Sequence, residues 1–535
     1  MRLNRSLGLL LAGSLLVSGC TAGPAAPVSS PPSMAASSAA PSPGPTSTTV
    51  GDLQLATSPS PVVDRLHLPE VNPKVPGVAA GLGPDLNGYL TQRVQWFDCE
   101  QGTRCAGVYA PLDYADPGRA SVTLVMRRKP ATKQPSLGTL FINPGGPGAS
   151  GTELVTSFAS AGLETYDIVG WDPRGTGQST PIRCLSDADT DAYNELDLSP
   201  DDPAERAALL AGVEAFNKGC WERNGRLLEH VGTIETVRDL DLLRRLLKQP
   251  KLNFVGYSYG TQIGAYYAEL FPEHTGRLVL DAAVNITTDE SIPQAEGFEL
   301  ALTHYAKWCA ERSCPLGSTE AAVKASITGL WDRLDAHPLT VTGGTLTQSL
   351  AVTGVAAMLY GGSEAWPSIA LLVESARNGD GRGLLAAADI LNGRSEDGSY
   401  GPMVYAFPAI GCRDSTDDGV VDADQQWVAD QKKAPIFGKY FGPSYGCALW
   451  PVRPDVQLHP TGAGAAPLLV IGGLGDNATP YRYAEWMAKQ LTSATLITYT
   501  GEGHGTFGGK SKCVDDAVIA YLTQGTVPAD GLRCS

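Results

Sequence analysis

The chain of 535 residues lacks a long run of basic residues. It carries 40 lysines and arginines against 56 aspartates and glutamates, which gives a formal net charge of -16 and an isoelectric point near 4.9. A surface that binds phosphates needs clustered positive charge. The charge balance therefore argues against a nucleic-acid partner.

Cofactor and metal motifs are also missing. No cofactor-binding motif is present, and histidine is scarce, with seven in the chain. The short cysteine pairs Cys99/Cys105 and Cys309/Cys314 lack the second close pair or the histidines that a zinc site needs. We therefore expect neither a metal nor a cofactor.

The N-terminus has the pattern of an export signal. Two arginines precede an apolar run, Leu7 to Leu16, which is too short to span a bilayer as a stable anchor. It ends in Val17-Ser18-Gly19-Cys20, which resembles the lipobox of bacterial lipoproteins. We expect residues 1–20 to be a lipoprotein signal peptide ending at a lipidated Cys20; an ordinary cleaved signal is the alternative. The protein would then be exported and lipid-anchored on the outer face of the cytoplasmic membrane or cell envelope, with no other membrane contact.

The other ten cysteines are even in number, as expected for disulfides in an exported protein. The sequence does not choose among about 945 possible pairings. Pairing of neighbours along the chain is the simplest pattern, because it staples single turns and pins the C-terminal helix. It gives the pairs Cys99-Cys105, Cys184-Cys220, Cys309-Cys314, Cys412-Cys447 and Cys513-Cys534.

The length exceeds that of one ordinary domain, and the composition changes along the chain. Residues 21–91 begin rich in Pro, Ser, Ala and Thr, and we expect them to form a disordered spacer. From about residue 92, short β-branched runs alternate with amphipathic stretches, which predicts a mostly parallel central sheet with helices on both faces. The pattern of strands stops at about 284 and resumes after 460, so residues 285–460 should form a large helical cap inserted between two parts of an α/β core, 92–284 and 461–535.

The strands and helices of the core follow from the periodicity of apolar residues and from the glycines and prolines that end each run. We expect strands at 107–111, 121–127, 137–143, 166–171, 252–257, 277–281, 467–471 and 494–499, and helices at 233–248, 259–271, 481–491 and 514–523.

One strand runs directly into Gly256-Tyr257-Ser258-Tyr259-Gly260 and is followed by a helix. This is the setting of a nucleophile elbow, in which a serine sits on a strained strand-to-helix turn between glycines. The pentapeptide alone is a weak signal, but the apolar strand before it and the amphipathic helix after it strengthen the prediction. We therefore expect Ser258 to be a catalytic nucleophile.

A serine nucleophile needs a histidine base and a carboxylate that orients it, and both should follow later strands. Among the seven histidines only His504 follows a terminal strand, in the loop Gly501-Glu502-Gly503-His504-Gly505. For the acid we select Asp476, which follows the strand at 467–471. Glu502 is the competing carboxylate.

An oxyanion also needs two backbone N–H donors. One comes from the residue after the nucleophile, Tyr259, and the other from the loop after the third strand. That loop reads Pro144-Gly145-Gly146-Pro147-Gly148, and Gly146 is the best candidate.

Taken together, these motifs resemble those of the secreted bacterial tripeptidyl aminopeptidases, in the proline iminopeptidase branch of the α/β-hydrolases. The resemblance extends from about residue 92 to a TAP-like C-terminal region. It implies an α/β-hydrolase fold, a cap over the active site, secretion with several disulfides, and cleavage of short peptides from free N-termini. The motifs are Asn143 to Gly148, Trp171 to Gly177, Gly256 to Thr261, Asp476 to Pro480 and Gly503 to Gly505.

Aminopeptidases of this branch need acidic groups that hold the substrate ammonium, and the sequence does not single them out. The candidates are Asp281, Asp289, Glu290 and Glu296, each of which could equally be a solvated charge. In the turn Asp172-Pro173-Arg174-Gly175, we favour a structural salt bridge over a role in positioning substrate.

Three functions remain open on sequence grounds. The first is a lipid-anchored exopeptidase that acts on peptide substrates and releases di- or tripeptides. The second is a carboxylesterase that uses the same triad, and the third is a binding lipoprotein that keeps the fold without activity. The complete triad favours an enzyme. The sequence does not indicate an oligomeric state.

Overall fold

The structure is a computed structural model that describes residues 77–287, 291–415 and 419–535. The signal peptide, Cys20 and most of the expected spacer lie outside these residues, as do Asp289 and Glu290. No helix in the described part of the chain is long and apolar enough to cross a membrane.

In the described part of the chain, eleven strands form one central sheet in the order β13-β12-β11-β8-β7-β5-β6-β4-β3-β2, with β1 paired to β4. The pairs from β13 to β6 are parallel, whereas β6, β4, β3 and β2 pair antiparallel. The mostly parallel sheet is the one that the sequence predicts. Its strands are β1 (Val78–Ala80), β2 (Phe97–Asp98), β3 (Arg104–Pro111), β4 (Ala120–Lys129), β5 (Gly138–Asn143), β6 (Tyr166–Trp171), β7 (Leu252–Tyr257), β8 (Thr275–Asp281), β11 (Leu468–Gly475), β12 (Ala494–Glu502) and β13 (Leu532–Cys534).

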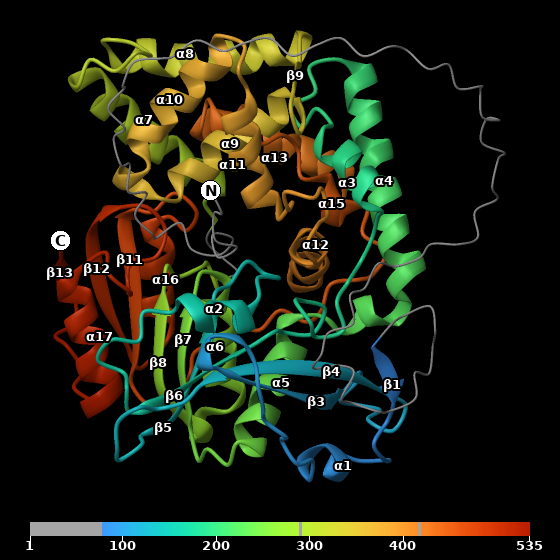
Figure 1. Cartoon of the computed structure of the whole chain (residues 1–535), viewed down its shortest axis with the longest axis vertical. Coiled ribbons are helices and arrows are strands. Elements are labelled where there is room, and N and C mark those ends of the chain that lie inside the picture. The colour runs from blue at the N-terminus through green and yellow to red at the C-terminus, as the bar shows by residue number, and fades with distance from the viewer. Residues whose placement is uncertain (1–76, 288–290, 416–418) are drawn as a thin grey trace, which may run out of the picture.

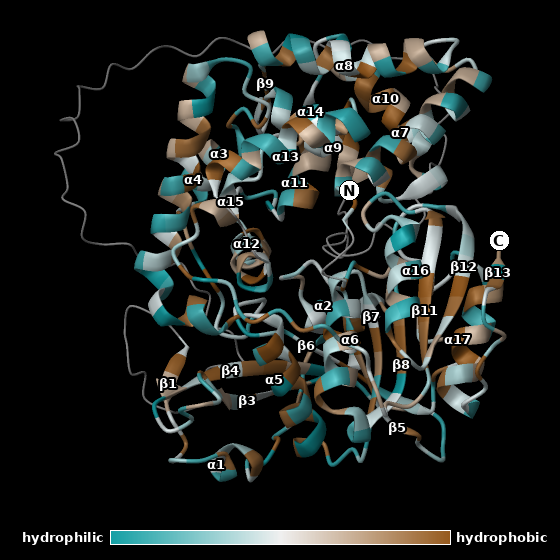
Figure 2. Ribbon diagram, turned by 180° about the vertical axis from the view of Figure 1, so that it is seen from behind, coloured by the Kyte–Doolittle hydropathy of each residue, from teal (hydrophilic) through white to brown (hydrophobic). Residues whose placement is uncertain are grey.

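Helices cover both faces of the sheet because successive side chains of a strand point to opposite sides. On one face, Val470 of β11 joins the apolar cluster of α5, α6 and α16; on the other, its neighbours Leu469 and Ile471 join that of α2 and α17. Strands β8, β11 and β12 are largely hydrophobic in Figure 2. The flanking helices are α2 (Gly151–Ser157), α5 (Thr233–Leu246), α6 (Tyr259–Leu270), α16 (Tyr481–Gln490) and α17 (Lys512–Gln524).

The folded body begins earlier than the sequence predicts. Strand β1 pairs with β4 through Val78 and Val122. Helix α1 (Asn87–Leu90) carries Tyr89, which is fully buried and donates a hydrogen bond to Pro117 O. The predicted spacer therefore ends too late, because residues 78–80 pair with β4, and a strand of three residues is too short for its alternation to be recognised in the sequence.

The inserted segment forms a helical cap with an apolar core of its own, distinct from the two layers beside the sheet. Figure 1 shows this cap in the upper half of the molecule and the sheet in the lower half. The elements of the insertion are α7 (Gln294–Glu311), α8 (Glu320–Ala336), β9 (Leu339–Val341), β10 (Gly344–Leu346), α9 (Gln348–Leu359), α10 (Trp366–Arg377), α11 (Arg382–Asn392), α12 (Met403–Asp414), α13 (Val420–Lys433), α14 (Phe437–Tyr440) and α15 (Tyr445–Ala448).

Two helices from an earlier part of the chain lie beside the cap, which the sequence did not indicate. Helices α3 (Asp187–Asn194) and α4 (Pro203–Asn224) follow β6, and α4 runs along one side of the molecule in Figure 1. Leu209 and Val213 of α4 pack in one apolar cluster with Tyr445 of α15. Helix α12, in contrast, comes from the inserted segment but packs against the core. Its Tyr405 and Ile410 belong to the apolar cluster beside the sheet.

The sulfurs of the ten described cysteines lie in five pairs, in the neighbour pattern that the sequence suggested. One pair ties α12 to α15 and another ties α17 to β13. The pairs are Cys99–Cys105, Cys184–Cys220, Cys309–Cys314, Cys412–Cys447 and Cys513–Cys534.

Arg174, in the turn after β6, forms a fully buried ion pair. Its Nη2 lies 2.7 Å from Asp239 Oδ1, and neither side chain is exposed. The guanidinium also donates to the carbonyl oxygens of Leu112, Pro111 and His230, so its donors are used within the fold. This arrangement matches the structural salt bridge favoured for the turn.

Replacing Asp239 with alanine should leave that buried cation without its counter-ion. We expect the free energy of unfolding to fall by about 3–5 kcal/mol, because an uncompensated buried charge is far more costly than a lost surface pair. Urea unfolding followed by tryptophan fluorescence measures the change. The matched control is Asp380→Ala, which breaks an exposed pair with Arg382 and should leave the unfolding curve unchanged. Equal effects of the two variants would contradict the assignment.

Candidate active site

Ser258 stands on a sharp turn between β7 and α6. Its backbone has φ 55° and ψ −126°, a conformation that costs a non-glycine residue free energy and is kept where the surroundings impose it. Two hydrogen bonds hold the turn, from Ser258 N to Asp281 O (2.9 Å) and from Thr261 N to Ser258 O (2.8 Å). A Cβ on Gly256 would lie 2.3 Å from Gly260 O, so this turn requires glycine there.

The parallel strands bring the other expected residues to the same edge. The loops after β5, β7, β8, β11 and β12 meet at the carboxyl ends of these strands, where ligands bind in folds of this kind. Gly505 shows how close they are, because a Cβ on it would lie 3.8 Å from the ring of Tyr257, the residue before Ser258. The hydroxyl of Tyr257 donates to Phe507 O, in the loop that carries His504.

His504 and Asp476 are directly paired. His504 Nδ1 lies 2.9 Å from Asp476 Oδ1 and 3.0 Å from Oδ2. Asp476 is almost fully buried, and its Oδ1 also accepts hydrogen bonds from the backbone N–H groups of Ala478 and Thr479. Burial acts to raise the pKa of Asp476, but His504 and these hydrogen bonds outweigh it, so that pKa lies below its ordinary value. An ionised Asp476 holds the imidazole with Nδ1 protonated, which leaves Nε2 as the proton acceptor.

Glu502, the competing carboxylate, faces away toward the cap. Its Oε1 lies 2.9 Å from Nδ1 of His304, on helix α7. Of the two carboxylates proposed as the acid, Asp476 therefore contacts the His504 ring, whereas Glu502 links the histidine loop to the cap.

The glycine loop after β5 lies against the nucleophile turn. Gly145 and Gly146 have φ of 92° and 105°, which glycine adopts without strain. A Cβ on Gly145 would lie 2.9 Å from both Ser258 Cβ and Tyr259 N, so only hydrogen fits between the two loops. Tyr259 is the first residue of α6, where backbone N–H groups have no acceptor within the helix. The structure thus places the glycine loop, at Gly145, against Ser258 and the backbone nitrogen of Tyr259.

The cap contacts the site at two places that sequence reasoning missed. Tyr360, after α9, accepts a hydrogen bond from His504 N (3.1 Å), and its ring stands edge-on to the imidazole with centroids 5.4 Å apart. Helix α12 lies over the glycine loop, since a Cβ on Gly148 would be 3.0 Å from Ala406 Cβ. No periodicity in the sequence could assign these contacts, because they depend on how the cap docks.

The candidates for substrate binding fare unequally. Asp281 is fully buried, and its carboxylate accepts hydrogen bonds from Thr506 N and Phe507 N, so its proposed role as an ammonium ligand is wrong. Glu296 lies in the first turn of α7, 35% exposed and 3.9 Å from Lys433 Nζ. Glu290, with Asp289, lies outside the described residues.

A cluster of three carboxylates that the sequence did not reveal lies near the start of α5. A Cβ on Gly232 would be 3.2 Å from Asp414 Oδ1, 3.3 Å from Asp455 Oδ2 and 3.4 Å from Glu235 Oε2. We call Glu235, Asp414 and Asp455 the carboxylate cluster. Thr233 connects it to the nucleophile turn, because its hydroxyl hydrogen-bonds both Asp414 Oδ2 and the hydroxyl of Tyr259.

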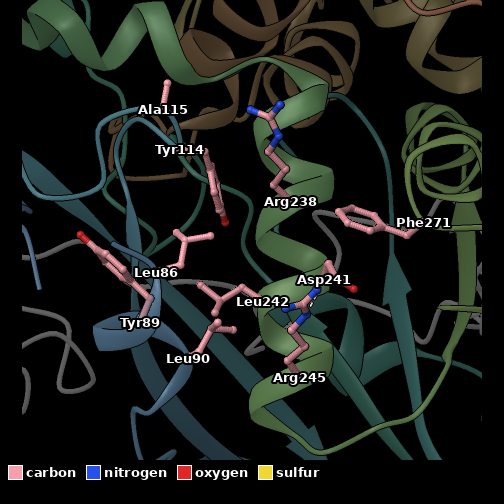
Figure 3. A pocket seen from close by; sticks show the side chains of 10 residues that line it. All are labelled: Leu86, Tyr89, Leu90, Tyr114, Ala115, Arg238, Asp241, Leu242, Arg245 and Phe271. Atoms are coloured by element: carbon pink, nitrogen blue, oxygen red, sulfur yellow. Dashed lines mark hydrogen bonds and ion pairs between the residues drawn. The ribbon is translucent and has the colours of Figure 1, made fainter. Parts of the chain in front are cut away.

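A separate hollow lies between α1 and one face of α5. Figure 3 shows its lining, which includes Tyr114, Arg238 and Phe271. None of the residues lining it belongs to the loops of Ser258, Asp476 or His504. It is therefore not part of the candidate active site.

The fold and the paired His504 and Asp476 beside a serine elbow define an α/β-type serine hydrolase. Two protein-family models match the chain, "alpha/beta hydrolase fold" over residues 138–342 and "TAP-like protein" over residues 434–534. The first match includes the Ser258 turn, and the second includes Asp476 and His504.

Three named relatives are similar to this chain over most of their length. Serine protease Hip1 of Mycobacterium tuberculosis is 35% identical over 484 residues, which cover 83% of this chain and 91% of the relative. Carboxylesterase B of the same species is 37% identical over 454 residues (81% and 86%). Tripeptidyl aminopeptidase of Streptomyces coelicolor is 31% identical over 469 residues (83% and 86%). The chain belongs to the TAP-like family of α/β hydrolases, and it is a serine hydrolase.

Proposed function

We propose that this protein is an exported aminopeptidase that releases di- or tripeptides from free N-termini. Ser258 attacks the carbonyl carbon of the scissile peptide bond while His504 Nε2 takes the hydroxyl proton. The N–H groups of Gly146 and Tyr259 stabilise the oxyanion. His504 then gives the proton to the leaving amine, and water hydrolyses the ester on Ser258 by the same steps.

The carboxylate cluster is the observation that favours an aminopeptidase over other acyl-transfer enzymes. Arg413 Nη2 lies 2.9 Å from Asp455 Oδ2 and pairs with one of the three negative charges. Glu235 is buried, with 8% of its surface exposed, and its Oε2 has no hydrogen-bond partner among the described residues. A buried carboxylate without a partner is costly. The ammonium of a substrate N-terminus would supply the donor and the positive charge.

The position of the cluster fits the release of short peptides. Tyr259, the neighbour of Ser258, is linked to the cluster through its side chain. Its hydroxyl hydrogen-bonds the hydroxyl of Thr233, which in turn hydrogen-bonds Asp414. An extended peptide advances by about 3.3–3.6 Å per residue. Because the path through these bonds is an upper limit on the separation, the cluster lies within reach of the N-terminus of a short peptide whose carbonyl is at Ser258, which supports an exopeptidase.

The test compares a tripeptide p-nitroanilide with a free N-terminus, its N-acetylated counterpart and a short p-nitrophenyl ester. Because acetylation removes the charge that the cluster would bind, we expect kcat/KM to fall by about 100-fold or more for the blocked peptide. Equal cleavage of the free and blocked peptides would rule out the aminopeptidase proposal.

Replacing Asp414 with asparagine should raise KM for the free tripeptide by about tenfold, with little change in kcat or in ester hydrolysis. Asparagine keeps an acceptor for Thr233 N, which Asp414 Oδ1 binds at 2.8 Å, so the fold is preserved while the charge is lost. Asp422 is exposed in the first turn of α13 of the cap, and Asp422→Asn is the matched control. If both variants bind the free tripeptide like the unmodified protein, Asp414 is not an ammonium ligand.

The same cluster predicts a pH dependence. Burial, opposed by the hydrogen bonds from Thr233 and assisted by the nearby charges of Glu235 and Asp455, raises the pKa of Asp414 to about 7. A carboxyl group loses its charge below its pKa, so KM for the free tripeptide should rise as the pH falls from about 7 to 6, an interval in which the substrate amine stays mostly protonated. The KM of the uncharged ester should stay constant over this interval. Parallel pH profiles of KM for the two substrates would contradict the prediction.

A carboxylesterase is the second candidate, because the relatives include a protein of that name and the same triad hydrolyses esters. It is favoured if the ester is cleaved faster than the free tripeptide. Export and lipid attachment at Cys20 remain part of the proposal and rest on the sequence pattern. Metabolic labelling with a fatty-acid probe, with Cys20→Ser as control, tests the anchor, since the variant should carry no label.

A further inference from the structure

One buried residue is hydrogen-bonded to both the nucleophile turn and the histidine loop. Asp281 is the last residue of β8, and in the sheet it lies opposite Tyr257 of β7 and Ile471 of β11. Its backbone oxygen accepts the N–H of Ser258 at 2.9 Å. The position of the nucleophile amide is therefore set directly by Asp281.

The side chain of Asp281 binds the loop that carries the base. Its Oδ2 accepts hydrogen bonds from Thr506 N at 2.9 Å and from Phe507 N at 2.6 Å. These residues follow His504 by two and three positions. Hydrogen bonds from backbone N–H groups to a carboxylate are about twice as strong as those to a neutral acceptor. The charge of Asp281 thus determines how firmly the loop of His504 is held.

Lys510 holds the same loop from its other end. It is partly exposed, and its Nζ donates to His504 O at 2.9 Å. The charged and titratable groups that face Asp281 are Asp476, Lys510 and the hydroxyl of Tyr257. His504 is consequently held by Asp476 at its ring, by Tyr360 at its backbone N–H, by Lys510 at its carbonyl and by Asp281 further along the loop.

The cost of this arrangement indicates a function. Asp281 is fully buried, and its Oδ1 has no hydrogen-bond partner among the described residues. A buried polar atom without a partner destabilises the fold, and such atoms in native proteins call for an explanation. An apolar residue would fill the end of a central strand at less cost but could not accept the two N–H groups.

We propose that Asp281, supported by Lys510, is a positioning residue that fixes His504 relative to Ser258 through its ionised carboxylate. The proposal rests on the proposed serine mechanism but not on the identity of the substrate. Burial, opposed by the hydrogen bonds from Phe507 and Thr506, raises the pKa of Asp281 to about 6, so protonation near that pH would loosen the loop.

The test uses Asp281→Asn in the full chain, because asparagine keeps an oxygen that can accept both N–H groups while the charge is lost. We expect kcat for a p-nitrophenyl ester to fall by about 10- to 100-fold with KM changed less than about twofold, as for a weakened positioning group. The acidic limb of the kcat/KM–pH profile should also become less steep, since one of two ionisations is removed. The matched control is Asp167→Asn, whose carboxylate accepts Ala131 N at the opposite end of β6.

Fluorophosphonate labelling separates this proposal from the proposed function. The probe reacts with an activated serine, and its reaction does not depend on the binding of a peptide substrate. If the unmodified protein is not labelled, the serine mechanism itself fails. If the unmodified protein is labelled and Asp281→Asn is labelled at the same rate with the same pH profile, Asp281 does not position His504. Lys510→Gln serves if Asp281→Asn does not fold: labelling slowed by about tenfold supports the proposal, and an unchanged rate overturns it.

Discussion

Replacing Ser258 with alanine is expected to lower hydrolysis of every substrate by about 10⁶-fold, to the level left by binding and the oxyanion donors alone. The hydroxyl is the only group lost, and the turn does not depend on it, because it is held by backbone hydrogen bonds of Ser258 with Asp281 and Thr261. Steady-state hydrolysis of a p-nitrophenyl ester measures the change.

The matched control for this variant is Ser157→Ala, at the exposed end of α2. It should retain full activity, and both variants should unfold at the temperature of the unmodified protein. Activity in Ser258→Ala within about tenfold of the unmodified protein would mean that another residue forms the covalent bond.

Replacing Asp476 with asparagine should lower kcat by about 10⁴-fold, because an amide can donate to His504 Nδ1 and stabilise the wrong tautomer. Asparagine still accepts the N–H groups of Ala478 and Thr479, so the loop should keep its shape. Turnover of the ester and of the free tripeptide should fall alike, because both need the same base.

Glu502→Gln is the paired control, since Glu502 is the other carboxylate of the histidine loop. It contacts His304 of the cap, and its loss should lower kcat by less than about tenfold. A large loss in Glu502→Gln with a small one in Asp476→Asn would reassign the acid.

The parts of the fold that the sequence predicted are those set by local pattern. Strands β6 and β7 begin and end where their apolar runs do, because glycine, proline or the serine turn stops each one. Strands β11 and β12 run further than expected, to Gly475 and Glu502, because glycines in both carry no periodic signal. The short β1 was missed, since its three residues gain their structure from pairing with β4.

The residues of the candidate site also fall into those that the sequence could predict and those that it could not. Ser258, Asp476 and His504 could be selected because the strand order requires a nucleophile, an acid and a base after particular strands. The carboxylate cluster could not be selected, because Glu235, Asp414 and Asp455 come from α5, α12 and a loop far apart in the chain. Asp281 was assigned to the wrong function for a related reason, since the sequence does not show which side of a strand end faces the cleft and which faces a neighbouring loop.

Related proteins of this family carry different names. Serine protease Hip1, carboxylesterase B and tripeptidyl aminopeptidase are all similar to this chain across the core and the insertion. The triad can act on esters and on amides, so the choice of substrate depends on groups around it. In this protein the groups around the triad include Tyr360 beside His504 and α12 over the glycine loop. The carboxylate cluster is the group that we propose selects peptides.

The most direct test of the central claim is to map the site of fluorophosphonate labelling by mass spectrometry. The structure predicts one adduct, on the peptide that contains Ser258, in the unmodified protein and none in Ser258→Ala. A folded protein that is not labelled, or an adduct at a different serine, would contradict the assignment of Ser258 as the nucleophile.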